Sequence, residues 1–293
     1  MSAEVRQRDA FERAIDAAPD HPEGYAVYGD WLSQTGDERG ELISLQLLPS
    51  LDRRQRERVK ALLYAPGIRC LAGPVAQWRW GFVHTVTLLR DGESVELERL
   101  LAHPSMRFVR ALALGEPMTE SLGALARAAP RVLSSLMLSS PRALDLATIP
   151  TTLPSLERLQ LSVPELIGAL PALPGLSALE IAFLEWTEAT AAQLFETNGS
   201  RLRAVKLHVS GAVEPATVRS VMSLPALEAL TIEASEMGID AVAALEDGAS
   251  IERLTTLELH QSGLTERAAR RVMQLSRRLP RLSSLVLGEA VES

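Results

Sequence analysis

Cysteine and aromatic residues are scarce in this sequence. Cys70 is the one cysteine, and aromatic residues make up only 4% of the 293 residues. A single cysteine excludes an internal disulfide and any zinc site built from several cysteines. The sequence also lacks a run of about 18 apolar residues, and its N-terminus has no apolar signal-peptide region. These absences predict a cytoplasmic protein without disulfides that does not contact a membrane.

Positive charge is scarce as well. Lysine occurs only at Lys60 and Lys206, and 30 Lys and Arg stand against 37 Asp and Glu, which leaves a net charge of -7. Nucleic-acid binding depends on clustered positive charge, so we expect no nucleic-acid partner. The basic run Arg53–Arg58 leaves phosphate contact open as an alternative, but Glu57 interrupts it and favours a solvated helix face.

Leucine and other aliphatic residues are abundant, and they recur in a regular spacing pattern. A pattern of three aliphatic residues, written L-x-x-L-x-L, recurs nine times at intervals of 20–28 residues. The middle residues of the nine copies are Val86, Leu112, Leu136, Leu159, Leu179, Val205, Leu230, Leu257 and Leu285. Chance does not maintain both a pattern and a period, so the chain contains an internal repeat.

Each copy predicts a short strand followed by a return segment. The alternation L-x-L gives a strand one apolar face. Several return segments have apolar residues at helical spacing, which predicts helices over 189–195, 215–222, 239–245 and 265–275. The prolines between Pro141 and Pro174 predict irregular, helix-poor returns there. No unit can bury its leucines alone, so we expect parallel strands stacked side by side in an α/β fold.

This pattern resembles the leucine-rich repeat family, and the longer copies resemble its ribonuclease-inhibitor-like subclass. The resemblance covers about residues 82–288 and implies a curved horseshoe-shaped solenoid, with strands on the concave face and helices or turns on the convex face. The family usually has Asn or Cys three residues after the last strand leucine, where the side chain bonds the turn backbone. Ser210, Ser235 and Ser262 occupy that place here and predict a weaker version of that bond, which Pro141 and Pro164 cannot make.

Residues 1–80 lack the repeat. Apolar residues at helical spacing predict a helix over 4–18, which Pro19 and Pro22 end, and a further helix over 52–64. Two motifs resemble the "repeat-companion" domain that precedes repeat arrays in some bacterial proteins: Asp30, Trp31 and Leu32, and then Gly36, Asp37, Arg39, Gly40 and Glu41. The resemblance implies a small helical capping domain over 1–80, followed by about nine repeats over 81–293.

Polar side chains alternate with the strand leucines and predict a partner-binding surface on the concave face. The charged members of this set are Arg158, Glu180, Lys206, His208, Glu233, Glu258 and His260. An ordinary polar surface that binds nothing is the competing interpretation. A ladder in which Glu233 neighbours both histidines is another, and a metal site is disfavoured because His208 and His260 are two strands apart.

We expect no cofactor, no metal and no catalytic residue. The sequence has no phosphate-cradling glycine loop, no G-x-S-x-G and no H-E-x-x-H. Cys70 has no histidine within ten residues, which favours a buried structural thiol over a nucleophile.

The C-terminal end of the array is a second candidate contact. Six arginines lie near it: Arg267, Arg270, Arg271, Arg277, Arg278 and Arg281. No terminal cap is recognisable, so the strand over 283–287 could present a free edge to a partner or to a second copy. The alternative is that the last helix covers it.

Two functions fit this sequence. The first is a non-catalytic scaffold that binds an unidentified protein through the concave face. The second is a regulator of an enzyme, either an inhibitor or a stimulator of a small GTPase. Both rest partly on the architecture that the resemblance implies.

Overall fold

The computed structural model describes residues 3–63, 75–88, 94–115, 119–182, 186–260 and 263–288, and Cys70 and Ser262 lie outside them. The fold is mixed α/β with a large parallel sheet, which among these residues stays open rather than closing into a barrel. The chain forms two compact units, residues 1–134 and 135–293. A domain boundary near residue 80 stays a prediction.

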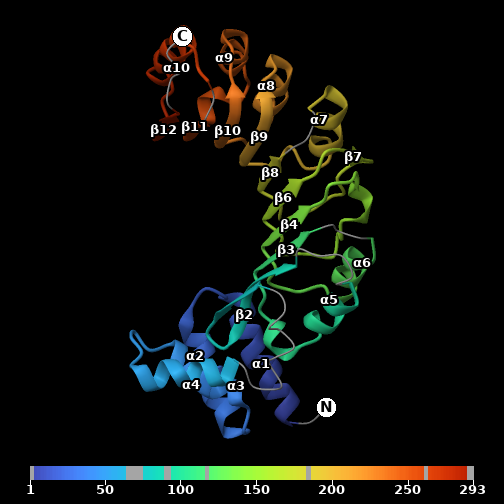
Figure 1. The fold of residues 1–293 in the computed structure, drawn as a ribbon, viewed down its shortest axis with the longest axis vertical. Helices are drawn as coiled ribbons and strands as arrows, with labels where there is room; N and C mark the ends of the chain where they lie inside the picture. The colour runs from blue at the N-terminus through green and yellow to red at the C-terminus, as the bar shows by residue number, and fades with distance from the viewer. Residues whose placement is uncertain are drawn as a thin grey trace. The chain divides into compact units, whose positions relative to one another are not determined.

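The first unit begins with helices and continues with strands and helices in alternation (Figure 1). Its elements are α1 (Ala3–Ala17), α2 (Pro22–Gln34), α3 (Glu38–Gln46), α4 (Arg53–Leu63), β1 (Val75–Arg79), β2 (Phe82–Leu88), α5 (Ser94–Leu101), the 3-10 turn η2 (Pro104–Met106), β3 (Ala111–Gly115) and α6 (Thr119–Ala128). β1 pairs antiparallel with β2, and β2 pairs parallel with β3. The helices expected over 4–18 and 52–64 are confirmed within a residue or two as α1 and α4.

The second sequence motif forms the corner between α2 and α3. Gly36 has φ of +80°, a conformation that suits glycine after a helix end. Asp37 then caps α3, because its side chain accepts a hydrogen bond of 2.9 Å from the Arg39 backbone N–H. The Arg39 guanidinium also donates to Asp37. Burial raises the pKa of Asp37, but these hydrogen bonds from Arg39 lower it more, so the carboxyl titrates below its ordinary value.

Gly40 and Glu41 complete this corner. A Cβ atom at Gly40 would lie 2.5 Å from the backbone oxygen of Gly29 and 2.5 Å from the backbone nitrogen of Ser33. Only glycine therefore allows α3 to approach α2 this closely. Glu41 forms a bidentate ion pair with Arg58 of α4, in which Arg58 Nε and Nη2 lie 2.8 and 2.5 Å from the two carboxylate oxygens. The basic run that contains Arg58 is thus partly neutralised within its own unit.

Most of the few aromatic residues gather in one core. Tyr25, Tyr28, Phe82 and Phe108 are all buried there, and Trp31 packs against them. Phe82 and Phe108 have ring centroids 4.7 Å apart in a T-shaped arrangement, and Tyr28 stacks on Phe82 at 6.0 Å. The aromatic side chains therefore join the helices of this unit to its strand β2.

The second unit alternates strands with turns and then with helices. Its elements are β4 (Ser135–Ser139), β5 (Leu144–Asp145), η3 (Leu146–Thr148), β6 (Arg158–Ser162), β7 (Leu166–Ile167), β8 (Ala178–Ala182), α7 (Glu188–Phe195), β9 (Ala204–Ala212), α8 (Pro215–Met222), β10 (Ala229–Glu236), α9 (Ile239–Glu246), η4 (Ile251–Arg253), β11 (Thr256–His260), α10 (Glu266–Ser276) and β12 (Ser284–Leu287). The return helices expected from the pattern are confirmed as α7, α8, α9 and α10.

Parallel pairing aligns the strand leucines of this unit. Leu159 pairs with Leu179, Leu179 with Val205, Val205 with Leu230, and Leu230 with Leu257. Each of these residues is at most 2% exposed, whereas the residues that alternate with them along the strands are mostly half-buried. The aligned aliphatic rows therefore form one core, and they leave the other strand face to polar side chains.

The helices α7–α10 lie on one side of these strands (Figure 1). Thr265 is the N-cap of α10, and its hydroxyl accepts a hydrogen bond from the Ala268 N–H at 3.3 Å. The two proline-rich returns, from β4 to β6 and from β6 to β8, contain no α-helix, as predicted. Both returns are fully described, and they hold only η3 and the paired two-residue strands β5 and β7. Proline interrupts helical hydrogen bonding, which explains why these returns lack the helices that the later returns have.

One expectation for the turns is wrong. Ser210 and Ser235 do not bond the backbone of a turn, because β9 and β10 continue past these positions. Val209 still pairs with Ala234, and Ala212 with Glu236. The register shifts between these two pairs, so Ser210 and Ser235 lie in an irregular part of the strand pairing rather than in a turn.

Candidate functional site

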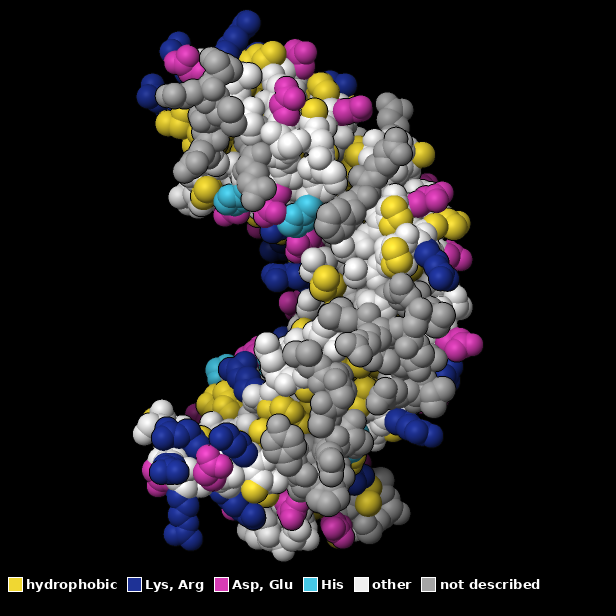
Figure 2. Space-filling view, viewed as in Figure 1, with side chains coloured by type: hydrophobic (Ala, Val, Ile, Leu, Met, Phe, Trp, Pro, Cys, Tyr) yellow, Lys and Arg dark blue, Asp and Glu magenta, His cyan; other side chains and the backbone are white. Residues whose placement is uncertain are grey.

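The predicted surface residues lie on one face of the second unit's strands, which we call the polar strand face. Because side chains alternate along a strand, the residues that flank the buried leucines point to this face. The predicted charged residues are Arg158, Glu180, Lys206, His208, Glu233, Glu258 and His260, and the space-filling view shows histidine and acidic side chains next to each other beside the strands (Figure 2).

Four of these side chains form one connected network across β8, β9 and β10. Lys206 Nζ lies 2.8 Å from Glu233 Oε1 and 3.9 Å from Glu180 Oε1. His208 Nε2 lies 2.8 Å from Glu180 Oε1, and His208 Nδ1 lies 2.6 Å from Glu233 Oε2. The two basic side chains of β9 are thus held between the two carboxylates of its neighbouring strands.

His208 bridges the two carboxylates through both ring nitrogens. The contact of Nε2 with Glu180 is a hydrogen bond, and Nδ1 lies within ion-pair distance of Glu233. The ammonium of Lys206 lies between the same two carboxylates, so their negative charge is partly compensated within the protein. A partner would have to compete with these internal ion pairs or bind to the network as a preformed surface.

Two pKa values in this network are shifted. The hydrogen bond to Glu233 raises the pKa of Lys206, and Glu180 adds to this effect against the opposing effect of burial. The hydrogen bond from Lys206 lowers the pKa of Glu233, with a further contribution from His208. Both shifts favour the charged forms, so the ion pair persists over a wide range of pH.

A second pair lies on the next strand. His260 Nε2 is 3.3 Å from Glu258 Oε2, and the Thr231 hydroxyl donates to the same oxygen at 3.2 Å. Glu233 lies beside both His208 and His260 in the strand register, but its side chain pairs with His208, whereas the ring of His260 contacts Glu258. Thr231 is a member of this cluster that the charge-based selection did not include, although its place in the same strand column could have indicated it.

Arg158 stands apart from the other predicted residues. It is exposed at the start of β6, where the register pairs it with Ala178. The described part of the chain offers it no ion pair or hydrogen bond. The structure thus brings together Glu180, Lys206, His208 and Glu233, adds Glu258 and His260 as a separate pair, and leaves Arg158 alone.

The network is an arrangement of ion pairs rather than a metal centre. No group of three or more histidine, cysteine, aspartate or glutamate side chains among the described residues has a geometry that could hold a metal ion. Lysine at the centre of the network also opposes a cation there.

The first unit contains a buried carboxylate that the sequence analysis missed. Glu12 is 3% exposed; it accepts a hydrogen bond of 3.1 Å from the Tyr28 hydroxyl and forms an ion pair with Arg107. Burial and the neighbouring Glu12 carboxylate both raise the pKa of Tyr28. Burial raises the pKa of Tyr25 to about 12. Glu12 stands one turn before the buried Ile15, a spacing that could have indicated a buried position.

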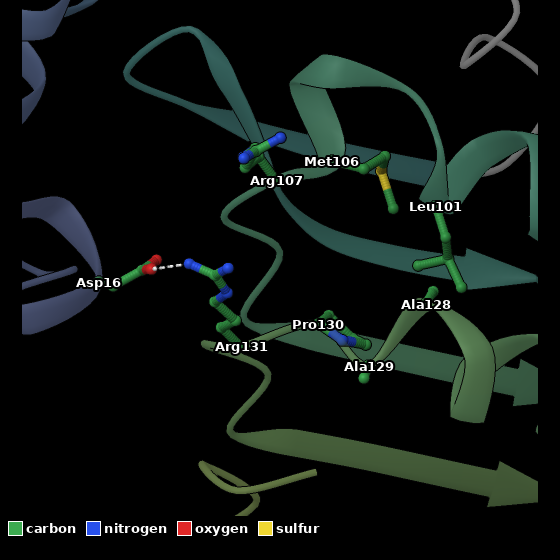
Figure 3. A pocket seen from close by; sticks show the side chains of 8 residues that line it. All are labelled: Asp16, Leu101, Met106, Arg107, Ala128, Ala129, Pro130 and Arg131. Atoms are coloured by element: carbon green, nitrogen blue, oxygen red, sulfur yellow. Dashed lines mark hydrogen bonds and ion pairs between the residues drawn. The ribbon is translucent and has the colours of Figure 1, made fainter. Parts of the chain in front are cut away.

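Arg107, the ion-pair partner of Glu12, lines a pocket of about 240 Å³ (Figure 3). Its lining residues are Asp16, Leu101, Met106, Arg107, Ala128, Ala129, Pro130 and Arg131. Arg131 Nη1 lies 3.4 Å from Asp16 Oδ2, and Arg107 pairs with Glu12. Since each guanidinium already faces a carboxylate of the same unit, the pocket offers no uncompensated charge for a ligand.

Comparison with models of known protein families gives no match, and comparison with curated proteins gives none either. In the described part of the chain, every helix is too short or too polar to cross a membrane. The functional argument therefore depends on the residues themselves.

The network leads to a prediction about pH. Replacing Glu233 with Gln should lower the free energy of unfolding by about 0.5–1 kcal/mol at pH 7, the size typical of partly exposed ion pairs. Because the folded state lowers the pKa of Glu233, this contribution is present above the unfolded value of about 4.3 and is lost as pH falls through the folded value. The difference from the wild type should therefore shrink as the pH is lowered toward about 3, and urea unfolding at both pH values measures it.

Glu157→Gln is the matched control for this prediction. Glu157 is exposed just before β6, and its side chain has no ion pair among the described residues. The Glu157→Gln variant should have nearly the free energy of unfolding of the wild type at either pH. An equal loss of stability in both variants, or a Glu233→Gln effect that grows toward acid pH, would contradict the ion pair.

Proposed function

We propose that this protein is a non-catalytic scaffold that binds a partner protein through the polar strand face. The second unit then belongs to a curved leucine-rich repeat solenoid, in which this face is concave and the helices and turns are convex. A helical repeat-companion domain over residues 1–80 precedes the array. We propose a cytoplasmic location for it.

The alignment of the aliphatic rows supports the solenoid. Strands in a sheet are about 4.8 Å apart, whereas packed helices need about 8–10 Å. An array with strands on one side and helices on the other must therefore curve toward the strands. The absence of α-helices between β4 and β8 relaxes this requirement there, so the curvature should be weaker in that stretch.

The observation that carries the function is the network around His208. Its four side chains are 23–36% exposed and are held by contacts of 2.6–2.8 Å from three adjacent strands. Charged side chains that are already fixed lose less conformational entropy on binding than free ones. A fixed arrangement of alternating charge also selects for a partner with the complementary pattern. The network thus suits selective recognition of a polar protein surface.

The test compares partner capture by two variants with matched charge. Lys206→Gln with Glu258→Gln removes one positive and one negative charge from the polar strand face. Arg253→Gln with Glu252→Gln removes the same charges at exposed positions of η4, outside the strands. Neutral glutamine is preferred to charge reversal, because a glutamate at position 206 would face Glu180, Glu233 and Glu258 together and could destabilise the fold.

Each form is used for affinity purification from the native host, and mass spectrometry identifies the captured proteins. We expect the wild type and the η4 variant to capture the same partner protein. The polar-face variant should bind that partner at least tenfold more weakly, a loss of about 1.4 kcal/mol in binding free energy. If all three forms capture the same proteins, the partner binds elsewhere on the molecule and not through the polar strand face. Regulation of an enzyme stays a prediction. An assay of the captured partner's enzymatic activity, with and without this protein, tests it.

A further inference from the structure

The last strand of the second unit is less covered than the strands before it. β12 pairs with β11, and the register places Leu285 beside Leu257 and Leu287 beside Leu259. Leu257 and Leu259 are 0% exposed, whereas Leu285 and Leu287 are only half-buried. Leu282 is half-buried too, although Leu254 at the corresponding place before β11 is fully buried. The aliphatic core is therefore partly open at this end.

The backbone of β12 is open as well. β12 is the end of the strand order, and no described strand pairs with its outer edge; residues 289–293 lie outside the described part. Ser284 N–H donates to Thr255 O at 3.0 Å, and Gly288 N–H donates to Leu259 O at 2.6 Å. Because backbone groups alternate in direction along a strand, the N–H groups of Leu285 and Leu287 point to the outer edge. They are positioned to pair with another strand.

Exposed positive charge precedes β12 in the chain. Arg277, Arg278 and Arg281 lie between the end of α10 and the start of β12, and all three are exposed. The other arginines of α10 include Arg270, which pairs with Glu266, and Arg271, which pairs with Glu246. Figure 2 shows Lys and Arg side chains gathered at the end of the second unit where α10 lies. Among the described residues, Arg277, Arg278 and Arg281 form no ion pair within 4 Å, although the charge of Arg278 helps to lower the pKa of Glu246.

We propose that an extended, acidic segment of a partner protein adds to the outer edge of β12 as a further strand. Its backbone would pair with the outward groups of Leu285 and Leu287, which is strand addition to an open sheet edge. Alternate aliphatic side chains of the segment would cover the half-buried leucines, and acidic residues beside Ser284 would meet the arginines. This surface is separate from the polar strand face.

The arginines distinguish an acidic partner from a second copy of this chain. Parallel pairing of β12 with a second β12 would place the exposed arginines of the two copies side by side, and like charges that face each other across an interface oppose association. In an antiparallel pair they would lie at opposite ends of the strands, and the light-scattering measurement below tests that case. An acidic segment instead gains from the same arginines, both in affinity and in the rate of association.

The test measures binding of two synthetic peptides to the full chain by fluorescence anisotropy. The first is Glu-Asp-Leu-Thr-Leu-Thr-Leu-Ser with a fluorescein label, and the second replaces its two acidic residues with lysine. We expect the acidic peptide to bind at least about tenfold more tightly, and we expect this difference to shrink as salt is added. Equal affinity for the two peptides, or binding of neither, would overturn the proposal.

Two further comparisons locate the binding. Leu287→Pro removes an outward N–H group but leaves the hydrogen bonds to β11, which an edge strand tolerates; Leu287→Ala removes the same side chain and keeps the N–H. The proline variant should bind the acidic peptide about tenfold more weakly than the alanine variant. Arg277→Glu with Arg281→Glu should weaken binding by a similar factor. This variant leaves the backbone of β12 unchanged, so it tests the proposal even if the proline variant fails to fold.

The polar-face variant Lys206→Gln with Glu258→Gln should bind the acidic peptide as the wild type does. Loss of peptide binding in that variant would show that the peptide occupies the polar strand face instead. Light scattering measures the mass of the unliganded protein over a range of concentrations. A dimer that Leu287→Pro dissociates would show that a second copy occupies this edge and would overturn the acidic-segment proposal.

Discussion

Replacing Gly40 with Ala should destabilise the first unit by at least about 2 kcal/mol. The added Cβ would lie 2.3 Å from Ser33 Oγ and 2.5 Å from two backbone atoms of α2, the Gly29 oxygen and the Ser33 nitrogen. A side-chain atom can rotate away, but the backbone of α2 cannot move without disturbing the aromatic core. The helices α2 and α3 would therefore have to separate.

Urea unfolding followed by tryptophan fluorescence measures this effect. Three of the four tryptophans, Trp31, Trp78 and Trp80, belong to the first unit, so the signal reports mainly on it. Gly123→Ala is the control within the same unit. Gly123 lies in α6, and its nearest neighbour would be the end of the Arg127 side chain at 3.5 Å. That variant should be neutral or stabilising by up to about 1 kcal/mol. Similar results for the two variants would contradict the close helix crossing.

The second large effect is expected at Leu257. Leu257→Ala should lower the free energy of unfolding of the second unit by about 2–5 kcal/mol, because it opens a cavity in the aliphatic core. Leu257 is fully buried between Leu230 and Leu285 in the strand register. Its neighbours belong to strands on both sides, so the core cannot collapse easily around the missing atoms.

Leu285→Ala is the matched comparison, since Leu285 occupies the same register position on the next strand. It is only half-buried, so its loss should cost less than about 1.5 kcal/mol. Far-UV circular dichroism during urea unfolding measures both variants. Equal losses would mean that the end of the sheet is covered in solution, which would also count against an open edge at β12.

The repeating units could be read from the sequence because the signal is local and periodic. Alternating leucines identify each strand, and helical spacing with Thr265 as a cap identifies α10. The prolines between Pro141 and Pro174 indicate where the helices are missing, because proline excludes helix by its own covalent structure. The same reasoning failed at Ser210 and Ser235, where pairing between β9 and β10 extends further than the family pattern suggests.

The candidate site was predictable as a set of positions but not as a set of contacts. The strand alternation places Glu180, Lys206, His208 and Glu233 on one face, and the repeat spacing aligns them in columns. The spacing does not determine side-chain torsions, so it could not show that His208 bridges two carboxylates or that His260 turns to Glu258.

The sequence by itself determined the order of strands and returns, the buried aliphatic rows and the polar face, because these follow from periodicity within a few residues. Only the tertiary structure decided which distant residues meet. It placed Gly40 against the backbone of α2, brought Glu12 to Tyr28 and Arg107, and left Leu285 and Leu287 half-covered. Such contacts depend on the packing of several elements at once, and no local pattern in the chain records that packing.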